Sequence, residues 1–440
     1  MRIVRTLWVV VAVLLCGATL AAAQQPVSEP ARLRHALLVW HRLVLELVRH
    51  TATYSPPVAS RAFAYLGVTA FEALATGSDG LHSLAGQLNE LTPVPPREAG
   101  QSYDGAVVVQ AAMAHAAAAL FENTGPTGQR AMAAMARKAG ADAARGVPEE
   151  VVRRSEDYGR AVARHILAWA ATDGGATIEN MGFPLDYKLT EGPAHWVPTS
   201  LVRQQQFPLL PDWGRTRTFA MPNGASCGLP PPPAYSEAPG SQFYVEAIEV
   251  RDAVNGLTDE QRAIARFWSD DPMLSPTPPG HWISIAIDIL EKEDADLVTS
   301  AETLVRLGVT LADAFIGCWD AKYRYDLVRP LTYIRRLIDP KWEAILNTPP
   351  FPEYPSGHST QSGAAATVLT EMFGPAYAFE DGTHSDDGLP ARRFASFWAA
   401  AEEAGISRLY GGIHFRSAIE RGLDQGRCIG AYANALRTRN

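Results

Sequence analysis

Cysteine is scarce in this chain, with four residues in 440. Cys16 lies in the N-terminal apolar stretch, and the other three, Cys227, Cys318 and Cys428, are widely spaced. An odd number at such spacing predicts neither a disulfide framework nor a cysteine zinc site. Because Cys318 and Cys428 lie in apolar helical sequence, we expect both to be buried free thiols.

An excess of basic residues is also missing. The formal net charge is −8 at pH 7, which excludes the dominant basic surface that nucleic-acid binding requires. Any affinity for anions must therefore be local to one site. After the N-terminus there is no long apolar run, since Gln110 and His115 interrupt the Ala-rich segment 107–121. We expect no membrane span in the mature chain.

The first 23 residues have the parts of an export signal. Arg2 and Arg5 precede an apolar stretch at 7–15, and three alanines at 21–23 provide a small-residue cleavage site. We therefore expect residues 1–23 to be a signal peptide and the mature protein to be periplasmic or secreted. Its removal takes away two positive charges and leaves a more acidic chain.

Convincing alternating strand patterns are absent, whereas helical periodicity is frequent. Residues 24–173 predict an N-terminal helical bundle, with helices at about 31–50, 58–75, 104–122, 127–145 and 149–172. Pro and Gly then cluster, which predicts an irregular connection at 174–257. Residues 258–440 predict a second helical bundle, with a cap at Thr258, a periodic region at about 282–328, and helices at about 358–373, 389–404 and 416–437. The expected fold class is all-α, with two bundles.

The first of three motifs in the last third of the chain is Lys322, Arg329 and Pro330. Seven positions along a helix make nearly two turns, so we expect both cations on one helix face, with Pro330 where that helix stops. Two such groups can bind the same oxyanion, because guanidinium and ammonium groups donate several hydrogen bonds to its oxygens.

The second motif is Ser356-Gly357-His358, which precedes an Ala-rich helical run. Ser356 is expected to cap that helix, so the free N–H groups of its first turn would face the bound anion. Gly357 lets the backbone approach an oxyanion closely. His358 can exchange a proton there. An ordinary helix start is the alternative interpretation.

The third motif is Ser407-Arg408, followed six residues later by His414 across a Gly-Gly turn. It adds a third cation and a second histidine, although a lone histidine at such a junction is often a capping or packing residue. Three further polar residues have plain interpretations, namely Asp326 in an exposed helix pair with Lys322, His281 in packing at a helix start, and His384 in a surface loop. The alternatives are that His281 lines the entrance to the site and that His384 belongs to a loop near the site or to a metal-like cluster.

Together the motifs resemble the signature of the superfamily that joins vanadium-dependent haloperoxidases with type-2 phosphatidic acid phosphatases and bacterial non-specific acid phosphatases. The resemblance covers residues 319–426 closely. It implies the helical fold of vanadium chloroperoxidase and acid phosphatase. It also implies vanadate as cofactor, bonded to His414, with His358 as acid–base group. The oxygens of vanadate would be bound by Lys322, Arg329, Arg408, Ser356 and the amide of Gly357, with Lys322 polarising the group under attack.

Neighbouring residues favour the haloperoxidase branch. Trp319 and Phe351 match the chloroperoxidase-like pattern in which aromatic groups line the halide side, although core packing is the alternative. The superfamily's soluble phosphatases are shorter, and its lipid phosphatases span membranes. The expected substrates are hydrogen peroxide, a halide and an organic acceptor. Large apolar helical faces are compatible with a homodimer.

One departure from the family pattern affects His414. Members often carry an acid four residues after this histidine, where it can orient the ring, but this chain has Ala418. Glu420 or Asp424 are the nearest substitutes. Two other functions stay open: a phosphomonoesterase with His414 as nucleophile and His358 as general acid, and an oxyanion-binding protein without catalysis.

Overall fold

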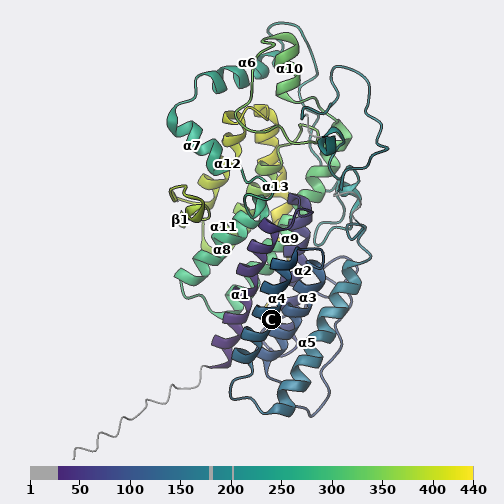
Figure 1. The fold of residues 1–440 in the computed structure, drawn as a ribbon, viewed down its shortest axis with the longest axis vertical. Helices are drawn as coiled ribbons and strands as arrows, with labels where there is room; N and C mark the ends of the chain where they lie inside the picture. Colours follow the sequence, from purple (N-terminus) through teal and green to yellow (C-terminus); the bar gives the residue numbers. More distant parts are fainter. Residues whose placement is uncertain (1–27, 178–181, 201–202, 440) are drawn as a thin grey trace, which may run out of the picture.

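The computed structural model describes residues 28–177, 182–200 and 203–439, so the predicted signal peptide lies outside the described residues. The first half is a bundle at one end of the molecule (Figure 1). Its helices begin and end within two residues of the expected bounds: α1 (Glu29–His50), α2 (Pro56–Ala75), α3 (Gly105–Leu120), α4 (Pro126–Ala143) and α5 (Glu149–Ala170).

The second half is also helical, which confirms the all-α prediction. Its helices are α6 (Gln242–Asn255), α7 (Asp259–Phe267), α8 (Thr277–Lys292), α9 (Leu297–Tyr325), α10 (Pro330–Leu337), α11 (Gly357–Phe373), α12 (Phe397–Tyr410) and α13 (Arg416–Asn434). Thr258 and Gln261 form the capping box that starts α7. The expected region 282–328 is two helices, because Asp296 caps a new helix directly after a left-handed Asp294.

A short hairpin replaces the start of the helix expected at 389–404. Strands β1 (Phe379–Asp381) and β2 (Arg392–Phe394) pair antiparallel, and α12 begins only where Ser396 caps it. Three-residue strands carry too little alternating pattern to be recognised in a sequence. The hairpin turn contains His384.

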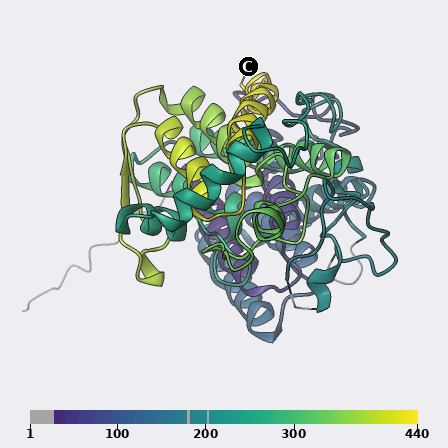
Figure 2. The same cartoon turned by 90° about the horizontal axis from the view of Figure 1, so that it is seen from above.

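The connection between the halves runs along one side of the molecule in both views (Figure 1 and Figure 2). It is irregular apart from the short 3-10 helices η2 (Arg203–Gln206) and η3 (Trp213–Arg215), but its last part forms α6. The predicted irregular segment 174–257 therefore ends in a regular helix. Among the described helices, none is long and apolar enough to cross a membrane.

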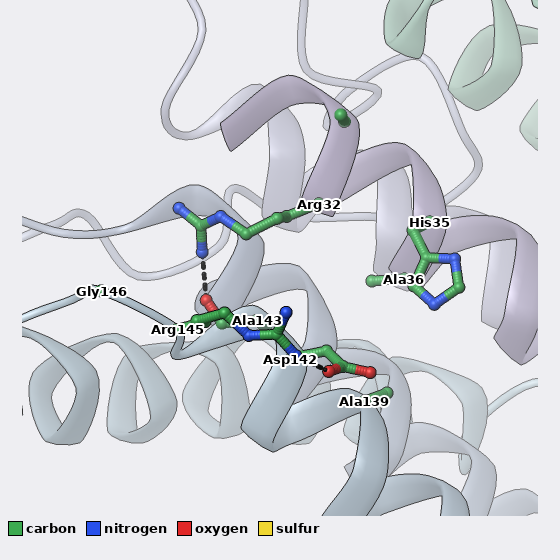
Figure 3. Close-up of a pocket in the computed structure, with 9 residues that line it drawn as sticks. Arg32, His35, Ala36, Ala139, Asp142, Ala143, Arg145 and Gly146 are labelled. Carbon is green, nitrogen blue, oxygen red and sulfur yellow. Dashed lines mark hydrogen bonds and ion pairs between the residues drawn. The ribbon is translucent and has the colours of Figure 1, made fainter. Parts of the chain in front are cut away.

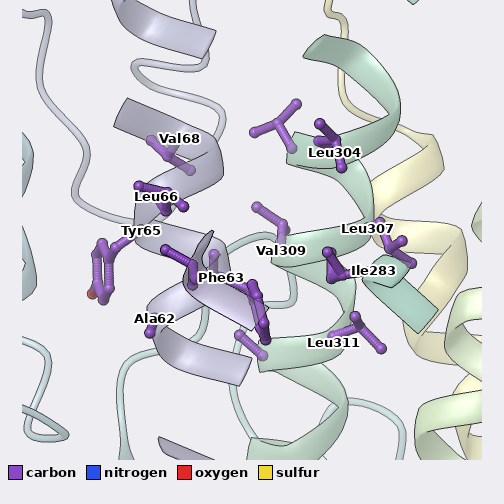
Figure 4. Close-up of a cluster of buried hydrophobic side chains, with 14 of the residues drawn as sticks. Ala62, Phe63, Tyr65, Leu66, Val68, Ile283, Leu304, Leu307, Val309 and Leu311 are labelled. Atoms are coloured by element: carbon purple, nitrogen blue, oxygen red, sulfur yellow. The ribbon is translucent and has the colours of Figure 1, made fainter. Parts of the chain in front are cut away.

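Helix α9 joins the two halves through one continuous core. Its N-terminal part packs against α2, with Val309 directed toward that helix, while Leu307 and Leu311 lie on the opposite side with Ile283 of α8 (Figure 4). The backbones approach closely at Gly308, where a β-carbon would lie 2.9 Å from the carbonyl oxygen of Phe63. Its C-terminal part, with Phe315 and Trp319, packs against α11 and α13. This 29-residue helix thus connects the core of the first half to the region that contains the three motifs.

The predicted free thiol of Cys428 is wrong, because Cys428 forms a disulfide with Cys227. The bond ties the connection to α13 across 201 residues of sequence. The spacing of the cysteines hid the pairing, since only the fold brings these positions together. Cys318 is a buried free thiol, as predicted.

Removal of this disulfide should destabilise the protein. In the double variant Cys227→Ser, Cys428→Ser, the free energy of unfolding should fall by about 2–5 kcal/mol, because closing a loop of this length restricts the unfolded chain. Guanidinium unfolding followed by tryptophan fluorescence measures the change. A reductant should lower the stability of the wild type and leave the double variant unchanged; equal stability of the two proteins without reductant would contradict the prediction.

Candidate active site

The three predicted motifs meet between the ends of four helices. Lys322 lies in the last turn of α9 and Arg329 caps α10, while Ser356 caps α11 and Arg408 lies in the last turn of α12. His414 lies in the turn before α13. The side chains of the three cations are all buried. Burial of cations at one place is costly unless negative charge compensates for it.

Lys322 and Arg329 do not share a helix face, contrary to the prediction. Helix α9 ends at Tyr325, because Asp326 adopts a left-handed conformation with φ 46°. Both side chains instead converge on the segment before α11. The Arg329 Nε donates to the carbonyl oxygen of Phe351 at 2.9 Å, and the Lys322 Nζ donates to that of Pro352 at 2.9 Å.

Trp319 and Phe351 lie together beside these cations. Their ring centroids are 4.9 Å apart, the Lys322 Nζ lies 5.1 Å from the Phe351 ring centroid, and the Arg329 Cζ lies 5.0 Å from it. The buried indole of Trp319 donates to the carbonyl oxygen of Leu209 in the connection. The two rings thus form an aromatic wall, and both cations lie at cation–π distance from the Phe351 ring.

The ring of His414 is held in one tautomer. Its Nδ1 lies 2.8 Å from the Glu353 Oε1, and its Nε2 lies 3.2 Å from the Arg329 Nη1. A guanidinium can only donate, so Nε2 must carry the lone pair and Nδ1 the proton. Burial, and after it the charge of Arg329, holds the pKa of His414 well below its usual value. The neutral ring therefore offers Nε2 as a ligand or nucleophile.

Glu353 is the residue that the sequence analysis missed. Its Oε1 also accepts from the backbone N–H of Phe415 at 2.8 Å, so this oxygen is an acceptor for both donors. Burial raises the pKa of Glu353 to about 7, and Oε2 has no hydrogen-bond partner. The signal was a lone carboxylate in the apolar run 351–355. Glu353 orients the ring of His414, which is the role that family members often give to an acid four residues after this histidine.

The two residues that were expected to replace the acid missing at position 418 lie in other surroundings. Glu420 is exposed, and Asp424 pairs with Arg421. Ala418 is fully buried, and its carbonyl oxygen accepts from the backbone N–H of Ser356 at 3.0 Å. Position 418 therefore supports the start of α11, while the carboxylate reaches His414 from the opposite side of the motif.

Ser356 caps α11, as predicted. Its Oγ accepts from the backbone N–H of Ser359 at 3.3 Å, and the helix begins at Gly357. A β-carbon on Gly357 would lie 3.6 Å from Phe315 and 3.9 Å from Trp319. These are ordinary van der Waals distances, so the rings of α9 lie directly beside the N-terminus of this 17-residue helix, whose dipole favours an anion.

His358 and Arg408 form the other side of the site. The His358 Nε2 lies 3.5 Å from the Arg408 Nη1 and 3.7 Å from an Asp270 oxygen. Arg408 is fixed by the hydroxyl of Ser407 and the carbonyl oxygen of Trp268. Burial, and after it the charge of Arg408, holds the pKa of His358 well below its usual value.

The buried cations provide positive charge for an oxyanion. Burial lowers the pKa of Lys322 to about 7 and those of Arg329 and Arg408 to about 10. These shifts indicate positive charge that a bound anion would stabilise. The Arg329 Nη2 is buried without a partner and is free to donate. The Lys322 Nζ already donates to the carbonyl oxygens of Pro352, Glu353 and Pro355, so it also fixes the segment before Ser356.

Two of the three remaining candidates, Asp326 and His384, differ from expectation. Asp326 pairs with His195 and not with Lys322. His384 is buried, so its assignment to a surface loop is wrong: the hairpin folds inward and its ring reaches Asp270. His281 lies at the start of α8, as predicted, but between two carboxylates.

A separate hollow lies between α1 and α4 (Figure 3). Arg32 donates to the carbonyl oxygen of Ala143 and Arg145 pairs with Asp142 at its edge, while Ala31, Ala36 and Ala139 line it. None of the predicted site residues lines this hollow. It plays no part in the chemistry of the motifs.

Fold and site together define a helical-bundle protein with a buried oxyanion site built on a neutral histidine. Residues 302–439 match the family of the VCPO second helical-bundle domain. A solved bacterial vanadium-dependent iodoperoxidase is 38% identical, over 92% of this chain and 97% of that one, with a TM-score of 0.85. The chain belongs to the vanadium-dependent haloperoxidase family, which confirms the predicted resemblance.

Two further proteins are similar to this chain at lower sequence identity. The vanadium chloroperoxidase of Curvularia inaequalis is 26% identical over 255 residues, and the match covers 42% of this chain and 42% of that protein. A bacterial vanadium-dependent chloroperoxidase in its holo form is 16% identical, over 88% of this chain and 94% of that one, with a TM-score of 0.67. At that identity the likeness is one of fold.

Proposed function

We propose that this protein is a vanadate-dependent haloperoxidase in which vanadate is bonded to the Nε2 of His414. The observation that carries the proposal is the lone pair of this nitrogen, fixed by Glu353 and directed toward a buried guanidinium. Arg329, Arg408, Ser356 and the amide of Gly357 would bind the vanadate oxygens, and Lys322 would join them by releasing one of its three backbone acceptors. Membership of the haloperoxidase family supports the activity.

Bound vanadate supplies Lewis-acid activation of peroxide without a change in its oxidation state. The net reaction converts hydrogen peroxide, a halide and a proton into a hypohalous acid and water. The ring of His358 lies beside Arg408 and is partly exposed, so it can take a proton from solvent and would supply the proton that the net reaction consumes. Trp319 and Phe351 keep water from the halide side, and Glu353 keeps the proton of His414 on Nδ1.

We propose iodide as the preferred halide. The relative with 38% identity is named an iodoperoxidase, and iodide gives up electrons more easily than bromide or chloride. Chloride and bromide are then slower substrates of the same site.

The proposal is tested by loading the purified mature chain with orthovanadate. Oxidation of iodide, bromide and chloride by hydrogen peroxide is followed separately, and hydrolysis of an aryl phosphate is measured in parallel without vanadate. We expect vanadate-stimulated turnover that falls in the order iodide, bromide, chloride. The proposal fails if vanadate stimulates no halide oxidation, and aryl phosphate hydrolysis that depends on His414 would support the phosphatase instead.

We also propose that the protein is exported. The N-terminal signal pattern supports this location, and so does the disulfide between Cys227 and Cys428, since such bonds persist mainly in oxidising compartments. The organic acceptor and the homodimer stay predictions from the sequence.

A further inference from the structure

One residue of the connection between the two halves bonds to both sides of the aromatic wall. The backbone N–H of Leu209 donates to the carbonyl oxygen of Pro350 at 2.8 Å, and Pro350 directly precedes Phe351. The carbonyl oxygen of Leu209 accepts from the indole N–H of Trp319 at 3.2 Å. The backbone of Leu209 therefore joins α9 to the segment before α11 at the place where the two rings meet.

The indole of Trp319 reaches from this carbonyl oxygen to the start of α11. Its N–H edge faces Leu209, and its opposite edge, at Cζ3, lies 3.9 Å from the position of a β-carbon on Gly357. The ring centroid lies 4.9 Å from that of Phe351 and 5.9 Å from the Lys322 Nζ. Because an indole is rigid, a displacement of its N–H edge also moves the edge that borders the oxyanion site.

Tyr323, one turn after Trp319 on α9, donates to the same carbonyl oxygen. Its hydroxyl lies 2.7 Å from the Leu209 oxygen, which thus accepts two hydrogen bonds and uses both of its lone pairs. Burial raises the pKa of Tyr323 well above its usual value, so the hydroxyl keeps its proton and remains a donor at neutral pH. A carbonyl group that is held by two donors has little freedom to turn away from the indole.

The turn that contains Leu209 is also fixed by contacts of its own. Leu210 has φ 49°, and left-handed backbone at residues other than glycine persists only where surrounding contacts enforce it. Its carbonyl oxygen accepts from the backbone N–H of Trp213 at 3.0 Å. A β-carbon on Gly214 would lie 2.4 Å from the backbone nitrogen of Asp320. The turn therefore packs directly on the backbone of α9.

We infer that Tyr323 is a positioning residue for the halide side, because it holds the carbonyl oxygen of Leu209 against the indole of Trp319. The inference rests on the proposed function in one respect, the assignment of the halide side to Trp319 and Phe351. It gives the connection a role in the site, since the backbone of the connection determines where the indole lies. An indole that is free to move should hold a halide less well.

Tyr323→Phe is the variant that tests this role. It removes one of the two hydrogen bonds to the Leu209 carbonyl oxygen and keeps the aromatic ring. In the vanadate-loaded protein, we expect the KM for iodide to rise by about two- to tenfold, the factor that one hydrogen bond contributes. The kcat and the KM for hydrogen peroxide should change by less than about twofold, because the vanadate ligands are untouched.

Hydrogen exchange of the Trp319 indole N–H reports on the ring without catalysis. Its NMR signal is assigned by its absence in Trp319→Phe. In Tyr323→Phe we expect this exchange to be faster by about tenfold or more, because the bond to Leu209 opens more often. Tyr333→Phe is the matched control, since the hydroxyl of Tyr333 on α10 donates to another carbonyl oxygen of the connection, that of Ser236, at 2.6 Å. The control should leave the exchange and the KM for iodide unchanged.

Gly214→Ala displaces the Leu209 carbonyl oxygen by a different route. The added β-carbon cannot lie 2.4 Å from the backbone nitrogen of Asp320, so the turn must move away from α9. Both donors, Trp319 and Tyr323, are then present but lie farther from their acceptor. We expect faster exchange of the indole N–H and a higher KM for iodide, as in Tyr323→Phe.

The outcomes separate the inference from the proposed function. The inference is overturned if an active Tyr323→Phe enzyme keeps the KM for iodide of the wild type, whether or not the exchange changes. Equal changes in Tyr323→Phe and Tyr333→Phe also overturn it, because they would reflect lower stability alone. If the exchange is faster as expected but the wild type oxidises no halide, Tyr323 positions the indole and the proposed function fails. If Tyr323→Phe does not fold, the same two measurements on Gly214→Ala decide.

Discussion

His414→Ala should abolish halide oxidation, with a loss of at least about 1,000-fold in kcat/KM for iodide. The substitution removes the Nε2 lone pair that the site presents and leaves the Nδ1 partner, Glu353, facing an empty space. The three buried cations remain, so the variant should still bind oxyanions. We therefore expect vanadate affinity to weaken without disappearing. Equilibrium titration with orthovanadate and initial rates of iodide oxidation measure the two quantities.

His50→Ala is the matched control for this variant. His50 is an exposed histidine at the end of α1 that pairs with Glu46, and its loss should leave vanadate affinity and rate unchanged. If His414→Ala retains more than about a tenth of the wild-type rate at saturating vanadate, His414 is not the ligand. In that case the neighbouring cations alone hold the anion.

The candidate site was predictable because its chemistry is concentrated in short motifs. Ser356 and Gly357 form the start of a helix wherever that helix lies, so their local structure follows from neighbouring residues alone. The structure brings the side chains of Lys322 and Arg329 together, as predicted, but not along one helix face. A periodic apolar pattern continues past Tyr325, and only the left-handed Asp326 ends the helix. Such a conformation in an aspartate depends on tertiary contacts, here a bond to His195.

Residues that act through distant partners could not be found in the same way. Glu353 reaches His414 across 61 positions of sequence, and Cys227 reaches Cys428 across 201. His384 looked like part of a surface loop because its neighbours are polar, yet its ring also reaches Asp270, 114 positions away in the sequence. In each case the partner is distant in the sequence, and only the fold brings the two residues together.

Loss of Glu353 should have the second largest effect. In Glu353→Ala, the Nδ1–H of His414 and the backbone N–H of Phe415 both lose their acceptor. The ring is then free to rotate and to exchange tautomers, so fewer molecules present the Nε2 lone pair at any time. Groups that orient a ligand histidine typically contribute 10- to 100-fold to affinity. We expect vanadate affinity to fall by about that factor, measured by equilibrium titration.

Glu353→Gln separates the hydrogen bond from the charge. The amide oxygen can accept from both donors, so we expect the tautomer of His414 to persist and vanadate affinity to stay within about fivefold of the wild type. The ¹⁵N shifts of the His414 ring report the tautomer directly in each variant. Equal losses in the alanine and glutamine variants would show that the charge of Glu353 matters and not its position as an acceptor.

An acid at position 418 should not restore the alanine variant. Ala418 is fully buried in the cluster that contains Tyr354, Phe415 and Ile419, and its carbonyl oxygen binds the N–H of Ser356. In Glu353→Ala, Ala418→Asp, the added carboxylate would have to displace this packing before it could reach His414. We expect lower stability and no recovery of vanadate affinity. Recovery to near the wild-type value would contradict this, because it would mean that both positions give access to the same ring nitrogen.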